Sequence, residues 1–201
     1  MRPEVARDLS ASASAFRDLV WPAVAAACGG GVLVPMEGVA DSRFARLVDQ
    51  LSGVDAWQII ESDGVMRGIA SRVQFGRAYA SFTIREARAS GRGTELEKRL
   101  KALQEKRRGW LLPALTVQGY VSGRTAGTLL YAAVGYSDEL YSYIAAGEEY
   151  DLRTNPDDGN TFVVLWVDRL KAVGIKIIEV EADGANPVRK KPKPTGRQLP
   201  L

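Results

Sequence analysis

The sequence predicts an α/β (α+β) fold, in which a central mixed sheet contains an antiparallel meander and is flanked by helices. Residues 53–85 consist of three apolar runs separated by turn residues, a pattern typical of consecutive antiparallel strands. Segments with apolar residues at helical spacing lie before and after this stretch. A chain of 201 residues is long enough for one domain with a sizeable core. We therefore expect one globular domain over residues 1–185 and a disordered, basic, proline-rich tail over residues 186–201.

The N-terminal part predicts the order helix, strand, helix. Residues 15–27 have apolar side chains at helical spacing, and Pro22 is expected to kink this helix or to begin a second one. A run of three glycines ends the helix, and residues 32–34 then read as a short buried strand. Asp41-Ser42 offers an N-cap for a further helix that leads into the meander.

The meander is predicted to contain strands over residues 54–60, 66–75 and 78–84. Asp63-Gly64 is a turn signal between the first two strands, because glycine adopts positive φ at no steric cost. Since the connections are short, we expect the three strands to be antiparallel neighbours in one sheet.

The middle of the chain predicts a helix followed by a hairpin. Thr94 and Glu97 have the spacing of a capping box, so a helix is expected over residues 94–108. Residues 115–121 and 128–134 read as two strands, and the glycine-containing segment between them indicates a hairpin turn.

The C-terminal part predicts a helix over residues 137–146, with Ser137 as its cap, and an acidic loop over residues 148–159. Residues 162–167 form a strongly apolar run and residues 175–180 another, and both are expected to be strands.

The chain has no histidine and a single cysteine, Cys28. This composition excludes Ser-His-Asp and Cys-His catalysis, histidine zinc sites and an internal disulfide. Cys28 is expected to act as a small buried hydrophobic residue. A bound metal would therefore be a hard ion with oxygen ligands, such as Mg²⁺.

The formal net charge of +3 is unevenly distributed. Residues 67–108 hold twelve basic and four acidic residues, a net +8, whereas residues 109–185 hold five basic and eleven acidic residues, a net −6. A concentrated positive segment is the electrostatic pattern of phosphate binding. A solvated helix face with scattered strand-edge arginines would give the same counts, so both interpretations stay open.

No segment is apolar for long enough to span a bilayer. The longest apolar stretch, residues 19–34, is interrupted by proline and glycine and lies too far from the N-terminus for a secretory signal. We therefore expect no membrane partner and a cytoplasmic location.

Three short motifs lie along the predicted strands in the first half of the chain. They are Gly53-Val54-Asp55, Ser71-Arg72-Val73-Gln74 and Phe82-Thr83-Ile84-Arg85. With them, residues 32–108 resemble the core of PD-(D/E)xK nucleases and uncharacterised proteins of phages and mobile elements. The resemblance implies a nucleic-acid-binding protein, either a magnesium-dependent nuclease with a degenerate motif or a core that binds without cutting.

The same resemblance implies roles for four residues. Asp55 and Glu37 correspond to the carboxylates that hold magnesium, Arg72 stands in the place of the family's lysine, and Gln74 in that of its second acid. The Glu-x-Lys pair itself is missing. Glutamine supplies only a neutral carbonyl and arginine stays protonated, so this departure puts cleavage in doubt.

Basic residues in and before the predicted helix over residues 94–108 are the candidates for contacts with DNA or RNA phosphates. These candidate nucleic-acid-binding residues are Arg85, Arg88, Arg92, Lys98, Arg99 and Lys101.

Two alternatives come from other functional classes. A non-catalytic interaction module, such as a phage inhibitor or structural component, would use the acidic residues 148–158 against a basic partner, as a homodimer or with a host protein. A nucleotide-binding protein would use the loop Ser90-Gly91-Arg92-Gly93 before a helix N-terminus.

Overall fold

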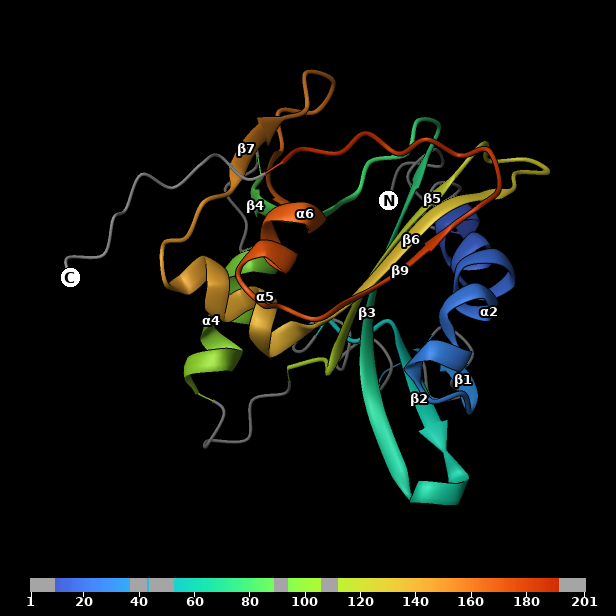
Figure 1. Cartoon of the computed structure of the whole chain (residues 1–201). Helices are drawn as coiled ribbons and strands as arrows, with labels where there is room; N and C mark the ends of the chain where they lie inside the picture. The colour runs from blue at the N-terminus through green and yellow to red at the C-terminus, as the bar shows by residue number, and fades with distance from the viewer. Residues whose placement is uncertain (1–9, 37–42, 44–52, 89–93, 106–111, 192–201) are drawn as a thin grey trace.

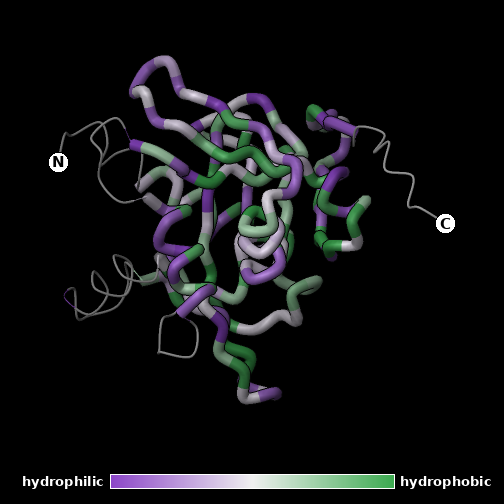
Figure 2. Tube along the Cα trace, turned by 90° about the vertical axis from the view of Figure 1, so that its left-hand side faces the viewer, coloured by the Kyte–Doolittle hydropathy of each residue, from purple (hydrophilic) through white to green (hydrophobic). Residues whose placement is uncertain are grey.

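The computed structural model describes residues 10–36, 43, 53–88, 94–105 and 112–191. It confirms the predicted class, since the protein contains a mixed six-stranded sheet, a second sheet of three strands, and helices (Figure 1). Figure 2 shows hydrophobic residues gathered along the central strands.

The larger sheet has the strand order β1-β2-β3-β5-β6-β9. Neighbouring strands are antiparallel except β3 and β5, which run parallel. In chain order these strands are β1 (Val32–Pro35), β2 (Ala56–Ile60), β3 (Val65–Phe75), β5 (Leu115–Val121), β6 (Leu129–Tyr136) and β9 (Ile177–Glu181).

The smaller sheet has the order β4-β8-β7, and both of its pairs are antiparallel. Its strands are β4 (Ser81–Ala87), β7 (Asp151–Thr154) and β8 (Thr161–Trp166). Strand β7 lies inside the segment that we expected to be an acidic loop. The strand was not predicted because its residues lack the apolar alternation that marks a strand.

Short helices connect the strands. They are η1 (Phe16–Val20), α2 (Trp21–Val24), η2 (Ala26–Cys28), η4 (Glu61–Asp63), α4 (Glu95–Gln104), α5 (Ser137–Ala145) and α6 (Val167–Ala172). The capping box of α4 is confirmed, with Thr94 and Glu97 bonded reciprocally. Ser137 is the first residue of α5 rather than its cap, and its hydroxyl lies 2.8 Å from that of Thr116.

The predicted meander is only half correct. β2 and β3 form the expected antiparallel hairpin around η4, and Gly64 has a φ of +61°. The third run, β4, pairs with β8 in the smaller sheet, so the prediction that all three strands share one sheet was wrong. Gly76, with a φ of +99°, turns the chain away after β3, and β5 occupies the position beside β3.

An N-terminal helical layer, residues 10–28, covers one face of the larger sheet (Figure 1). Its buried side chains include Val20 and Trp21, which pack on apolar residues of β3, β5 and β6. The layer approaches β5 closely, since a Cβ atom added at Gly119 would clash with Val20. Cys28 is buried here, as predicted.

The other face of the larger sheet is covered by the smaller sheet together with helices. One face of the smaller sheet, with Phe82 and Leu165, belongs to the apolar core that includes Leu140 and Tyr141 of α5. Alternate residues of β4 and β8 therefore point the opposite way, toward β3 and β5.

The chain from Asn186 to Lys190, called the C-terminal strap below, contacts the residues that precede β4. Val188 forms a parallel bridge with Tyr79 and exchanges backbone hydrogen bonds with Ala78 and Ala80. The sequence predicted a disordered tail over residues 186–201, and its composition does not reveal this pairing with a distant strand. Residues 192–201 lie outside the described residues.

Candidate functional site

A pocket of about 320 Å³ lies between the larger and the smaller sheet. Strands from both sheets contribute to its walls. The lining residues are Arg72, Gln74, Tyr79, Ser81, Thr83, Tyr120, Arg153, Thr154, Asn155, Phe162, Val164 and Trp166. The described lining residues include two arginines, Arg72 and Arg153, and no carboxylate. The pocket therefore combines a positive charge with aromatic walls.

Cations lie against the aromatic side chains of this pocket. The Arg72 guanidinium lies 4.5 Å from the ring centroid of Phe162, and that of Arg85 lies 5.7 Å from the same ring. Arg77 lies 6.0 Å from the ring of Tyr79. These distances are within the range of cation–π attraction, so the rings hold the cations near the pocket.

Arg72 links the pocket to helix α4. Its Nη1 atom lies 3.7 Å from a carboxylate oxygen of Glu95. Desolvation lowers the pKa of the Arg72 guanidinium, and the neighbouring Glu95 carboxylate opposes that shift. Arginine remains protonated at neutral pH even so, and the pocket keeps this charge.

A chain of hydrogen bonds runs along one wall of the pocket. Gln74 donates through Nε2 to the Thr83 hydroxyl over 3.1 Å, and that hydroxyl lies 3.0 Å from Oε1 of Gln118. The hydroxyls of Ser81 and Tyr120 lie 3.0 Å apart. Burial raises the pKa of Tyr120 to about 12, so its hydroxyl stays neutral at physiological pH.

Asp55 lies outside the pocket and contacts Ser71. Its carboxylate oxygen Oδ2 accepts a hydrogen bond from the Ser71 backbone N–H over 2.6 Å and lies 3.3 Å from the Ser71 hydroxyl. Asp55 is not among the residues that line the pocket. The Met36 backbone N–H donates to the Asp55 carbonyl, while Glu37 lies outside the described residues.

The described residues do not test the magnesium site that the sequence suggested, because Glu37 lies outside them. Within the described ranges there is no group of three or more His, Cys, Asp or Glu residues that could hold a metal ion. Arg72 and Gln74, expected beside Asp55, instead line the pocket. We therefore derive no reaction step through a metal.

The predicted phosphate-binding residues fall into different environments. Arg99 is 3% exposed, and its Nη2 atom donates to the Gly53 carbonyl over 2.6 Å, so this guanidinium lies inside the protein. Lys98 is half-buried and Lys101 is exposed on α4. Arg88 is half-buried, and its Nε atom has no hydrogen-bond partner in the described structure. Arg92 lies outside the described residues.

Reasoning from the sequence missed the pocket residues of the second half of the chain. Phe162 and Trp166 alternate with core residues along β8. Arg153 lies on β7, paired with Phe162, and Asn155 directly follows β7. The alternation in β8 was a signal for a strand with two different faces. No local signal showed that one of these faces meets β3.

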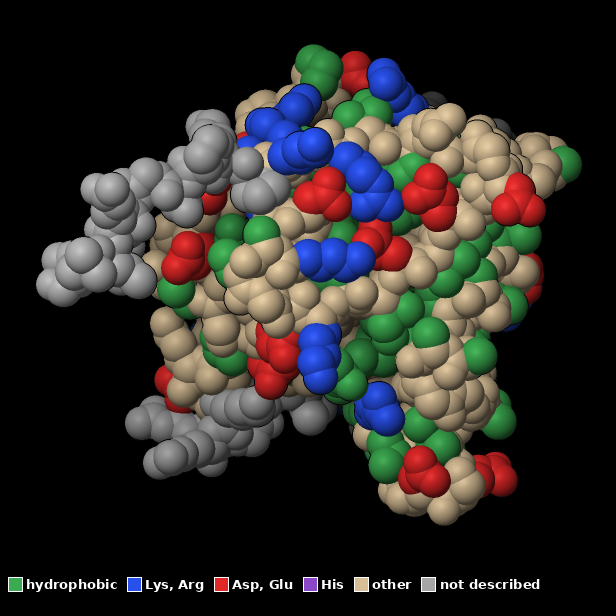
Figure 3. Space-filling view, in the orientation of Figure 1, with side chains coloured by type: hydrophobic (Ala, Val, Ile, Leu, Met, Phe, Trp, Pro, Cys, Tyr) green, Lys and Arg blue, Asp and Glu red, His purple; other side chains and the backbone are tan. Residues whose placement is uncertain are grey.

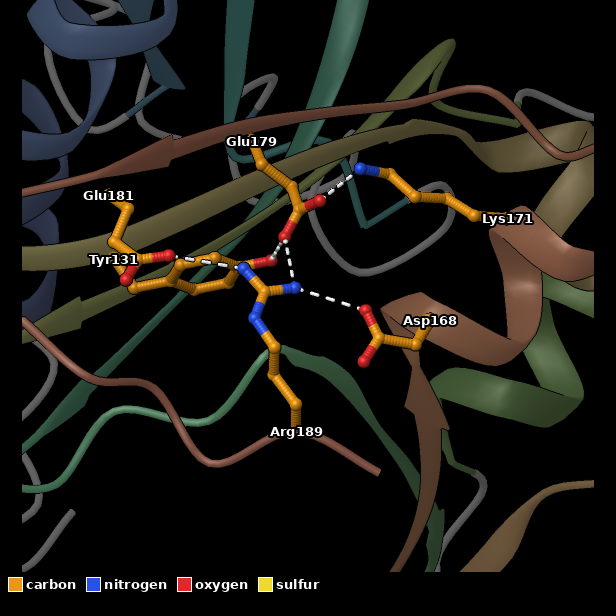
Figure 4. A network of polar contacts seen from close by, with 6 residues as sticks. All are labelled: Tyr131, Asp168, Lys171, Glu179, Glu181 and Arg189. Atoms are coloured by element: carbon orange, nitrogen blue, oxygen red, sulfur yellow. Dashed lines mark hydrogen bonds and ion pairs between the residues drawn. The ribbon is translucent and has the colours of Figure 1, made fainter. Parts of the chain in front are cut away.

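The C-terminal strap is fixed beside the pocket by ion pairs (Figure 4). Arg189 donates to Asp168, Glu179 and Glu181 over 3.0 to 3.1 Å. Glu179 also accepts from Lys171 and, over 2.6 Å, from the Tyr131 hydroxyl. Figure 3 accordingly shows basic and acidic side chains side by side over the region of α6 and the strap.

The next strap residue, Lys190, reaches a pocket wall. Its Nζ atom lies 2.7 Å from Asp151 and 5.8 Å from the Trp166 ring centroid. Desolvation alone would raise the pKa of Asp151, but hydrogen bonds from Lys190 and Trp166 lower it to about 2. Asp151 therefore stays ionised and holds the strap against β7 and β8.

Comparison with protein-family models, curated proteins and solved structures finds no match to this chain. Among the described residues, every helix is too short or too polar to cross a membrane.

Proposed function

We propose that this protein binds nucleic acid, DNA or RNA, at the pocket between the two sheets. The observation that carries the proposal is the composition of the pocket: aromatic rings with adjacent arginines, and no carboxylate among the described lining residues. Aromatic side chains stack on bases, and arginines contact phosphates or stack beside the bases.

Arg153 is the residue whose removal tests this proposal with the least disturbance. It is exposed and lines the pocket near the turn between β7 and β8. Arg153→Ala removes one positive charge without opening the core. The matched control is Arg17→Ala, which removes the same charge from an exposed site on the N-terminal helical layer.

The experiment measures fluorescence anisotropy of labelled oligonucleotides over a series of salt concentrations. Wild type should bind with an affinity that falls as salt rises, because phosphate contacts release counterions. Arg153→Ala should reduce the slope of log affinity against log salt by about 0.7 to 0.9, the value for one phosphate contact. The control should leave that slope unchanged. Absence of binding at low salt would contradict the proposal.

Magnesium-dependent cleavage stays a separate prediction, and the same samples test it. Incubation with magnesium, for wild type and for Asp55→Ala, would show cleavage only in wild type if Asp55 holds a catalytic metal. If both proteins bind the oligonucleotide and neither cleaves it, the protein binds nucleic acid without acting as a nuclease.

The structure gives less support to the alternative of an acidic protein-binding surface. Within the acidic residues 148–158, Glu149 and Asp151 pair with Arg169, and Asp151 also pairs with Lys190. Part of the negative charge is thus paired with basic residues of the same chain.

A further inference from the structure

We infer that the pocket holds one unstacked base of a single-stranded nucleic acid and contacts the polar edge of that base through Gln74. This inference rests on the proposed function and specifies the class of nucleic acid. It follows from the direction of the hydrogen bonds along the pocket wall, from the size of the pocket and from the placement of its rings.

The orientation of the Gln118 amide is fixed by a backbone donor. The Thr83 N–H must donate, and it meets Oε1 of Gln118 over 3.2 Å. Because this atom is an oxygen, the Thr83 hydroxyl donates its one proton to it over 3.0 Å. The hydroxyl oxygen of Thr83 is then an acceptor for its other neighbour, Gln74.

The orientation of Gln74 follows from that of Thr83. Its Nε2 atom must face the Thr83 hydroxyl, 3.1 Å away. An amide has two N–H donors and one carbonyl acceptor, so Gln74 retains one donor and its oxygen. Within the described residues neither of these groups has a partner, and Gln74 lines the pocket. An adjacent donor and acceptor are what a glutamine uses to bind a base edge bidentately.

The size of the pocket selects a single base rather than a duplex. Its volume of about 320 Å³ lies at the lower end of the range for small-ligand sites. A base inside a duplex cannot reach a pocket of this kind unless it leaves the stack, which costs free energy. A single strand presents its bases without that cost.

The rings of the pocket provide stacking surface for such a base. Tyr79 packs edge-on against Trp166, with ring centroids 6.5 Å apart, and both rings line the pocket. Phe162 lies beside the Arg72 guanidinium. Aromatic rings and planar guanidinium groups both stack on bases regardless of sequence. Arg153, an exposed residue of β7 at the pocket, is placed to contact the phosphate.

The test compares four probes at one salt concentration. They are a single-stranded oligonucleotide, an abasic strand of the same length, the duplex form of the oligonucleotide, and the matching free mononucleotide. Wild type should bind the single strand at least about tenfold more tightly than the other three. The abasic strand retains the phosphates and therefore separates base recognition from charge attraction.

Two pocket variants identify the site. Phe162→Leu removes a stacking ring and keeps apolar volume, and it should weaken single-strand binding about five- to tenfold. Gln74→Ala should weaken it about fivefold or more. Gln104→Ala, which removes the same side chain from an exposed position on α4, is the matched control and should have no effect. Thermal unfolding of each protein verifies folding, and Gln74→Ala carries the test if Phe162→Leu does not fold.

The outcomes separate the two proposals. Equal binding of the natural and abasic strands, or unchanged binding by a folded Gln74→Ala protein, would overturn the inference and leave general nucleic-acid binding intact. Equal affinity for the duplex or for the free mononucleotide would also overturn it. No binding to any of the four probes would overturn the proposed function itself.

Discussion

The two faces of strands β3 and β5 differ in the chemistry that they bury. Toward the N-terminal helical layer they present apolar side chains: Ile69, Val73, Leu115, Val117 and Val121. Toward the smaller sheet they present Arg72, Gln74, Gln118 and Tyr120, next to a cavity. Burying polar groups contributes less to stability than burying apolar ones. The first face therefore stabilises the fold, and the second is the one at which we propose that a ligand binds.

The largest effect is expected on the apolar face. Trp21→Ala removes a ring that is 5% exposed, and it should lower the free energy of unfolding by about 3–5 kcal/mol. Urea denaturation measures this loss. The affinity of the remaining folded protein for single strands should not change. A tenfold loss of affinity would show that the two faces are not independent.

A pocket residue should behave in the opposite way. Arg72→Met removes the charge beside Phe162 and keeps an apolar stem, so single-strand binding should weaken about tenfold. Stability should change by no more than about 1 kcal/mol, because the Arg72–Glu95 pair is partly exposed and Glu95 keeps contact with solvent after the change. The measurements are anisotropy and urea denaturation, with Arg17→Met as control. A loss of stability as large as that of Trp21→Ala would contradict the comparison.

The contrast between the two faces was only partly predictable from the sequence. Arg72 and Gln74 alternate with Val73 along β3, and this local pattern showed that they share one face. Their neighbours Phe162 and Trp166 could not be deduced, because the packing of β8 opposite β3 joins residues far apart in the chain. The expected partnership of Arg72 with Asp55 came from a motif resemblance, and the structure does not show it.

Local signals predicted the rest of the fold more reliably than long-range ones. The capping box of α4 depends on residues three apart, and it was found at the expected place. The contacts of the strap were not predicted, because they join Arg189 to three distant carboxylates and Val188 to Tyr79. A proline-rich and lysine-rich composition gives no indication of such partners.

The C-terminal strap is expected to contribute less to stability than the apolar face of the larger sheet. Arg189→Ala removes the contacts with Asp168, Glu179 and Glu181 and should lower the stability by about 1 kcal/mol, since these pairs are partly exposed. Lys191→Ala, a neighbouring exposed residue, should have no effect. Thermal unfolding at low and high salt measures both variants. Equal losses for the two would mean that the ion pairs contribute nothing specific.

The smallest effect is a pH dependence of the contact between Asp151 and Lys190. The folded-state pKa of Asp151 is about 2, below its ordinary value of 3.8, so its ionised form favours the folded state. This contribution is present above about pH 4 and is lost as the pH falls toward about 2. The difference in thermal stability between wild type and Asp151→Asn should shrink over that range. If the difference in thermal stability stays constant over this pH range, the lowered pKa of Asp151 is not linked to folding.

Photocrosslinking tests the claim that one face of the sheet binds nucleic acid and the other does not. A single strand that carries iodouridine is bound, irradiated and digested, and the crosslinked residues are located by mass spectrometry. We predict crosslinks at the pocket rings, Tyr79, Phe162 or Trp166. Crosslinks confined to the N-terminal helical layer, at Phe16 or Trp21, would contradict the account.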